Sequence, residues 1–274
     1  RLRPARVTFL GTSRTRLGIV PSEIEDELAL ERGRVANLGI DDSPPLRVLD
    51  DLLAKGWPPG VLVIEVMPGN FFARRTRAIP ALEPVPIWAR PNAELVKAWR
   101  RSTRLSNEDL QPLILAHKGA RYLAGKARHP LLDPAHVLHE DGWVEYRPAS
   151  DVPVPCNPEI AFQDYEPLEE PALAALLSQL QGKVAALEVM GVEVVFLRLP
   201  SAGRWQDLET KVFPRERYWE RLAMTFPGRC VWVGEAPLAL ELELAIPDGS
   251  HLDGPSARRL SRALAKLLRS RLGE

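Results

Sequence analysis

The sequence predicts an α/β fold: a five-stranded parallel sheet of flavodoxin-like, three-layer topology with a helical insertion after its third strand. Three observations predict it. Short runs rich in valine and leucine alternate with segments of helical periodicity. The run at 61–66, Val-Leu-Val-Ile-Glu-Val, is apolar almost throughout, as in strands buried on both faces. The 274 residues suffice for one large domain of this class, which we take as 1–274.

The individual elements follow from local signals. The expected strands are 6–10, 34–38, 61–66, 192–199 and 230–233. The expected helices are 21–32, 46–54, 171–190, 214–224 and 254–272, and the apolar run 238–244 is expected to pack as a short helix. Pro21 followed by Ser22 and Glu23 is typical of a first helical turn. With the common strand order 2-1-3-4-5, the loops after the first three strands meet at one place.

The alternation of strands and helices stops between residues 71 and 157. This insertion contains two helical patterns, 93–103 and 107–128, and then a polar passage with the run His-Val-Leu-His-Glu-Asp-Gly-Trp at 136–143. Residues 139–141 are expected to form a solvated turn. We expect the insertion to lie over the top of the sheet, where a solvated excursion and a lid over a cleft are equally good interpretations.

Bulk composition argues against several classes of function. Basic and acidic residues number 36 each, so no basic surface for nucleic acid is expected. Cys156 and Cys230 form no CxxC pair and the histidines form no paired cluster, so no metal site is expected. Whether the two cysteines form a disulfide stays open. The first loop has neither the GxGxxG pattern nor a P-loop, which disfavours a nucleotide-binding protein.

Candidate catalytic residues occur near both ends of the chain. Gly11-Thr12-Ser13 follows the first strand, so Ser13 can expose its hydroxyl and offer its N–H to a developing oxyanion. Taken alone, this tripeptide more often marks a helix cap. Asp248 precedes His251 by three residues in the segment 246–254, a spacing that lets the carboxylate meet Nδ1–H and leaves Nε2 for a serine. Together the two halves predict a Ser-His-Asp triad.

Further site residues come from the strand ends expected beside Ser13. Gly39, after the second strand, would offer a backbone N–H, and Asn70, after the third, a side-chain amide. With the Ser13 N–H they would form an oxyanion hole. Arg14 and Arg198 are possible substrate-binding residues. For Arg14 the alternatives are binding an anionic substrate group and facing solvent. For Arg198, at the end of the fourth strand, a salt bridge is the stronger alternative.

These motifs resemble the SGNH (GDSL) hydrolase family. Gly11-Thr12-Ser13 is similar to its first block, with Thr12 in place of the usual aspartate or serine. Asp248-Gly249-Ser250-His251 matches the DxxH of its last block. Gly39 and Asn70 are similar to the glycine and asparagine of its middle blocks, although Asn70 lacks the usual following aspartate. The resemblance implies the SGNH hydrolase fold, a covalent acyl-enzyme and no cofactor.

A narrower resemblance is to bacterial SGNH proteins of the cell envelope, many of them tethered by an N-terminal membrane helix. It rests on the Ser-Arg pair at 13–14, the Gly-Ile-Val-Pro run at 18–21 and the helix that follows the DxxH segment. It implies a serine esterase or O-acyltransferase that acts on an acylated small molecule, polysaccharide or envelope polymer. The alternative is a non-catalytic envelope scaffold that keeps the fold.

Location is predicted from the same resemblance. The sequence begins with Arg1 rather than Met, and we expect an upstream apolar segment of ~20 residues that tethers the full-length protein outside the cytoplasm. Arg1 and Arg3 beside such a segment favour the cytoplasmic side instead, so a cytoplasmic esterase is the alternative.

Overall fold

The computed structural model describes residues 5–40, 44–55, 59–75, 136–139, 143–146, 158–235, 238 and 242–272. Five strands form one parallel sheet in the order β2-β1-β3-β8-β9, which confirms the predicted order. The strands are β1 Val7–Gly11, β2 Val35–Gly39, β3 Gly60–Glu65, β8 Val192–Arg198 and β9 Cys230–Trp232. Each lies within two residues of its predicted bounds.

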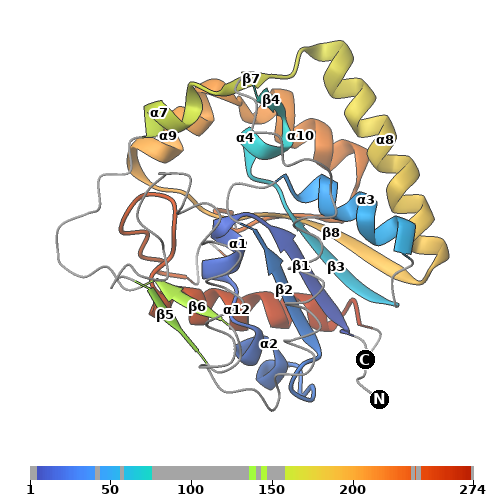
Figure 1. The fold of residues 1–274 in the computed structure, drawn as a ribbon, viewed down its shortest axis with the longest axis vertical. Helices are drawn as coiled ribbons and strands as arrows, with labels where there is room; N and C mark the ends of the chain where they lie inside the picture. Colours follow the sequence, from blue (N-terminus) through green and yellow to red (C-terminus); the bar gives the residue numbers. More distant parts are fainter. Residues whose placement is uncertain are drawn as a thin grey trace, which may run out of the picture.

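Helices cover both faces of this sheet (Figure 1). One face packs against α3 (Pro45–Lys55), α8 (Glu170–Val189) and α10 (Arg215–Thr225). The other packs against α2 (Pro21–Glu27) and α12 (Gly254–Arg269). The protein is therefore a three-layer α/β sandwich.

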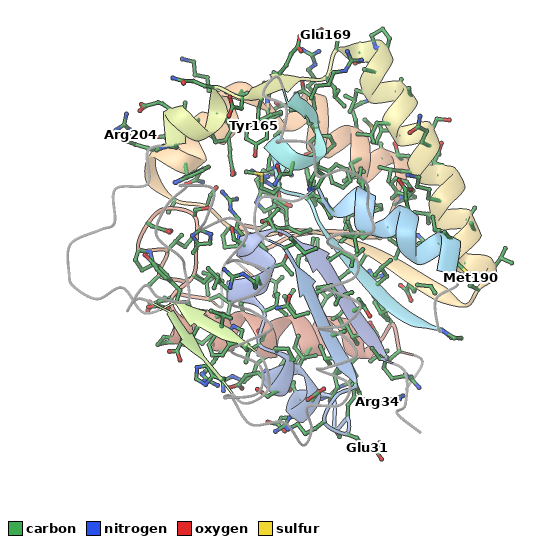
Figure 2. All side chains as sticks on the ribbon, in the orientation of Figure 1. Glu31, Arg34, Tyr165, Glu169, Met190 and Arg204 are labelled. Atoms are coloured by element: carbon green, nitrogen blue, oxygen red, sulfur yellow. The ribbon has the colours of Figure 1, made fainter. Side chains whose placement is uncertain are left out.

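The packing of the central strand β3 explains why its sequence is almost entirely apolar. Leu62 and Ile64 point into the core beneath α8, whereas Val61 and Val63 point into the core beneath α12. Side chains fill both spaces between the sheet and its helices (Figure 2). Because successive residues of a strand face opposite sides, both layers receive buried apolar side chains, each worth roughly 1.5–3 kcal/mol.

Two helical predictions need correction, and a helix that follows β8 was not predicted. The helix predicted over 21–32 ends at Glu27, since Ala29 adopts a positive φ of 52° that a right-handed helix cannot continue. Of the helix predicted over 238–244, Leu238 is helical and 239–241 lie outside the described residues, but residues 242–246 are irregular: the Ala245 N–H donates to Ser256 Oγ instead of to a helical carbonyl. The helix that was not predicted is α9, Gly203–Val212.

The insertion, 71–157, is described only at its start and in one hairpin. After α4 (Pro68–Phe71), β4 (Ala73–Arg75) pairs antiparallel with β7 (Tyr165–Pro167), beside the short α7 (Pro158–Phe162). A second antiparallel pair joins β5 (His136–Leu138) to β6 (Val144–Tyr146). The predicted helices 93–103 and 107–128 lie outside the described residues.

Candidate active site

Ser13 opens the short helix α1 (Ser13–Gly18), directly after β1 ends at Gly11. Thr12 caps this helix: its hydroxyl accepts the Arg14 N–H at 3.2 Å. Since Ser13 is the first helical residue, its own N–H has no acceptor inside the helix. The turn therefore presents a half-buried hydroxyl next to a backbone donor.

A buried carboxylate holds this turn in place through hydrogen bonds. Glu65, the last residue of β3, accepts hydrogen bonds from the Thr12 N–H at 2.6 Å and from the Thr15 hydroxyl at 2.6 Å. The Thr12 hydroxyl lies 3.1 Å from both of its oxygens. A Cβ at Gly11 would lie 1.9 Å from Thr15 Oγ1 and 2.3 Å from Glu65 Oε2, so only glycine fits there. Glu65 was not among the predicted site residues.

Ser13 joins His251 and Asp248 in one chain of hydrogen bonds. Ser13 Oγ lies 2.8 Å from His251 Nε2, and His251 Nδ1 lies 2.7 Å from Asp248 Oδ2. Burial by itself would raise the pKa of Asp248. The hydrogen bond and charge of His251, together with the backbone N–H groups of His251 and Ser250, outweigh it and lower that pKa. An ionised Asp248 fixes the proton on Nδ1, so Nε2 is left to accept from Ser13.

The loop that carries Asp248 and His251 depends on Gly249. Gly249 has a φ of +78°, which favours glycine, and a Cβ there would lie 2.8 Å from the Ala202 carbonyl oxygen and 2.9 Å from Trp205 Cδ1. The Ala202 N–H donates to the Gly249 carbonyl at 2.9 Å. The segment between β8 and α9 thus supports the loop along its backbone.

Gly39 lies where the second strand end was expected, against the first turn of α1. A Cβ on it would lie 2.5 Å from the Arg16 nitrogen and 2.8 Å from the Thr12 carbonyl oxygen. Its N–H, however, donates to Asn37 Oδ1 at 3.0 Å. The expectation that this N–H faces an oxyanion is therefore corrected, because the Asn37 side chain already accepts its hydrogen bond. The Asn37 amide in turn donates to the Thr15 and Ile19 carbonyls, at 2.9 Å each.

Asn70 lies in α4, at the carboxyl end of β3, and is buried. The Tyr165 hydroxyl donates to its Oδ1 at 2.8 Å, which assigns the acceptor end of the amide. A Cβ at Gly69 would lie 2.8–3.0 Å from carbons of the Tyr165 ring, so the glycine makes room for this tyrosine. Tyr165 comes from β7, near α4 (Figure 2). Neither Tyr165 nor this link was predicted.

Arg14 and Arg198 do not face solvent. Arg14 Nη2 lies 2.6 Å from Glu209 Oε1, and Arg198 Nη2 lies 2.8 Å from Glu209 Oε2. All three residues are buried, and Ser201 Oγ donates to Glu209 Oε2 at 2.8 Å. The alternative of a salt bridge is therefore the correct one for Arg198, and Arg14 has the same partner.

The β5–β6 hairpin packs against the same site. The Tyr146 ring lies 6.1 Å from the His251 ring at an interplanar angle of 62°, in an edge-to-face arrangement. Of the turn predicted at 139–141 only His139 is described, and it is half-buried: its Nε2 lies 2.6 Å from Glu145 Oε2, and its ring stacks on Trp143 at 4.7 Å. Residues 140–142 lie outside the described residues. The β5–β6 hairpin of the insertion therefore lies beside the imidazole.

The described residues also bear on metal ions, membrane helices and cysteines. Within the described residues, no group of three or more His, Cys, Asp or Glu could hold a metal ion. No helix in the same part of the chain has the length and apolar character needed to cross a membrane. Cys230 is a free thiol whose burial raises its pKa to about 12, and Cys156 lies outside the described residues.

Comparisons with protein-family models, with curated proteins and with solved structures give no match to this chain.

Proposed function

We propose that this chain is a serine esterase or O-acyltransferase of the SGNH type, with Ser13, His251 and Asp248 as its catalytic triad. The observation that carries the proposal is the chain of hydrogen bonds from Ser13 Oγ through the His251 ring to Asp248, at 2.8 and 2.7 Å. These distances lie within the reach that a nucleophile, its base and an orienting carboxylate need.

The proposed reaction has two halves. Ser13 Oγ attacks the carbonyl carbon of an ester while its proton moves to His251 Nε2. The bond from that carbon to the alcohol oxygen then breaks, and the imidazolium returns the proton to the departing alcohol. Water or a sugar hydroxyl next attacks the acyl-serine, and its proton passes through His251 to Ser13 Oγ as the acyl group leaves. The imidazolium formed in each half is stabilised by ionised Asp248.

Oxyanion stabilisation is assigned to two donors. The Ser13 N–H has no acceptor within α1, and the Asn70 side chain carries amide donors at the end opposite to its contact with Tyr165. Gly39 would join them only if its N–H left Asn37 Oδ1. The proposed oxyanion hole therefore consists of the Ser13 N–H and the Asn70 amide.

The substrate class follows partly from charge. Arg14 and Arg198, the possible substrate-binding residues, are both buried against Glu209, so neither presents a free guanidinium to an anionic acyl group. An acylated carbohydrate or envelope polymer is the substrate that the sequence resemblance supports.

A serine-reactive fluorophosphonate tests the proposal directly. We expect the wild-type chain to be labelled at Ser13, the Ser13→Ala variant to be unlabelled, and the Ser178→Ala variant to react like the wild type, since Ser178 is exposed on α8. Peptide mapping identifies the modified residue. A folded wild-type chain that does not react, and does not hydrolyse an aryl acetate, would favour a non-catalytic scaffold instead.

A further inference from the structure

We infer that Arg14 and Glu209 are positioning residues of the triad, and that the buried network they form with Arg198 sets the helix that carries Ser13 against the loop that carries His251. This inference rests on the proposed function and deepens it, because it names residues outside the triad on which turnover depends.

Arg14 bridges the two halves of the site. It follows Ser13 in the chain, and its Nε donates to Ser250 Oγ at 3.1 Å. Ser250 precedes His251, and its own N–H donates to Asp248 Oδ1 at 2.8 Å. One planar guanidinium therefore connects the residue after the nucleophile to the residue before the base. Guanidinium groups hold such geometry well because their donors lie in a fixed plane.

Glu209 holds Arg14 in that place. Its Oε1 lies 2.6 Å from Arg14 Nη2, while its Oε2 lies 2.8 Å from Arg198 Nη2 and accepts from Ser201 at the same distance. The Arg14 guanidinium also lies 5.6 Å above the Trp205 ring, one helical turn before Glu209. Arg198 ends β8, so the network joins α1, α9 and the central sheet in one buried unit.

Charge gives Glu209 a second task. Burial by itself would raise its pKa, but the attraction of Arg14 and Arg198 outweighs it and lowers that pKa, so the carboxylate stays ionised. Arg14 is also attracted by Asp248 and Glu65. An ionised Glu209 pairs with the Arg14 guanidinium and so limits the attraction between Arg14 and Asp248. The partner of Asp248 then remains His251.

Net stabilisation of the fold is a weak reason for this arrangement. Replacing a buried ion network by apolar side chains of similar volume is often neutral or stabilising, because two or three charges must be desolvated to form it. A triad, by contrast, loses activity when its groups shift by a fraction of an ångström. The network lies between the helix that carries Ser13 and the loop that carries His251. Because these two must keep a fixed relative position, the arrangement points to a positioning role.

The test compares Glu209→Gln and Ser250→Ala with Asp207→Asn, an exposed residue of the same helix. For turnover of an aryl acetate, we expect kcat to fall roughly tenfold to a hundredfold in the first two variants, with KM within about twofold. Labelling by a fluorophosphonate should slow in parallel. Asp207→Asn should match the wild type. Ser250→Ala removes only the hydroxyl, so it keeps the test decisive if Glu209→Gln fails to fold.

The outcomes separate this inference from the proposed function. A reactive wild type whose folded variants keep their kcat would overturn the positioning role alone. A rise in KM at constant kcat would instead make Arg14 a substrate-binding residue, which also overturns it. A folded wild type that neither reacts nor turns over would overturn the proposed function, and the inference with it.

Discussion

Asp248 holds His251 at two points. Its Oδ2 lies 2.7 Å from the ring Nδ1, and its Oδ1 accepts the backbone N–H of the same histidine at 2.7 Å. The first contact selects the tautomer that can accept from Ser13. The second fixes the backbone from which the ring extends, so one side chain sets both the protonation and the position of the base.

Replacing Asp248 by Asn should therefore disable the proposed enzyme without unfolding it. The amide can turn its NH₂ group toward Nδ1, which favours the wrong tautomer and leaves Nε2 protonated. We expect kcat for an aryl acetate to fall by about 10⁴, as in other enzymes with this triad. Asp207→Asn is the control. A folded Asp248→Asn variant within tenfold of wild type would show that this carboxylate does not orient the base.

Gly249 offers a test of the loop between the two triad residues. Ala at this position would have to adopt a φ of +78° and place its Cβ 2.8 Å from a carbonyl oxygen. We expect Gly249→Ala to lower the free energy of unfolding by about 1–3 kcal/mol and to reduce turnover.

Gly182→Ala is the matched control for that change. Gly182 lies exposed inside α8 and a Cβ there would meet nothing within 4 Å. It should raise the free energy of unfolding by about 1 kcal/mol, since alanine is the better helix former. Urea unfolding measures both variants. Equal effects in the two would mean that the loop tolerates a side chain after all.

The residues that sequence predicted best are those whose partners are local. Asp248 and His251 are three residues apart, so their contact depends on one turn. The alternation of elements predicted a parallel sheet, and the strand order common to such sheets brought Ser13 to the same edge. Gly39 shows the limit of this reasoning, because its N–H has a competing acceptor in Asn37 that a motif match does not reveal.

The sequence carries a signal for the buried contacts of Glu65 but none for those of Glu209. Glu65 is the one charged residue in the apolar run 61–66, and a carboxylate inside a buried strand signals partners. Glu209 gives no such signal, since Asp207 in the same helix is exposed and the two look alike in sequence. Its role depends on Arg14 and Arg198, which only the folded chain brings together.

Glu65→Gln tests how the nucleophile turn is held. The carboxylate accepts from Thr12 and Thr15, and a glutamine would replace one accepting oxygen by an NH₂ group and remove the charge. We expect the free energy of unfolding to fall by about 1–3 kcal/mol, together with a lower kcat. Glu166→Gln, at an exposed position of β7, should leave both unchanged. If Glu65→Gln kept wild-type stability and turnover, backbone contacts alone would be holding the nucleophile turn in place.

Acid should destabilise the protein through Glu209. The pKa of this carboxyl is lower in the folded chain than the ordinary 4.5, so the stabilisation is complete above that value. It is lost as the pH falls through the lower folded pKa, where the unfolded chain binds the proton more readily. We expect the free energy of unfolding of the wild type to decrease below about pH 4.5, and that of Glu209→Gln to decrease less steeply. Parallel curves from urea titrations would contradict the assignment.

The final prediction concerns Asn70 as an oxyanion donor. Asn70→Ala removes the amide, and if it binds the developing negative charge, kcat should fall by about 10²–10³ with little change in KM. Tyr165→Phe removes only the hydroxyl that donates to Asn70 Oδ1 at 2.8 Å, so the amide stays but is less firmly oriented. We expect a smaller loss of kcat in Tyr165→Phe than in Asn70→Ala. The double variant should be no worse than Asn70→Ala, because the hydroxyl acts through the amide. Losses that multiply in the double variant, or an unchanged kcat in Asn70→Ala, would remove Asn70 from the oxyanion hole and leave the backbone N–H of Ser13 as its main donor.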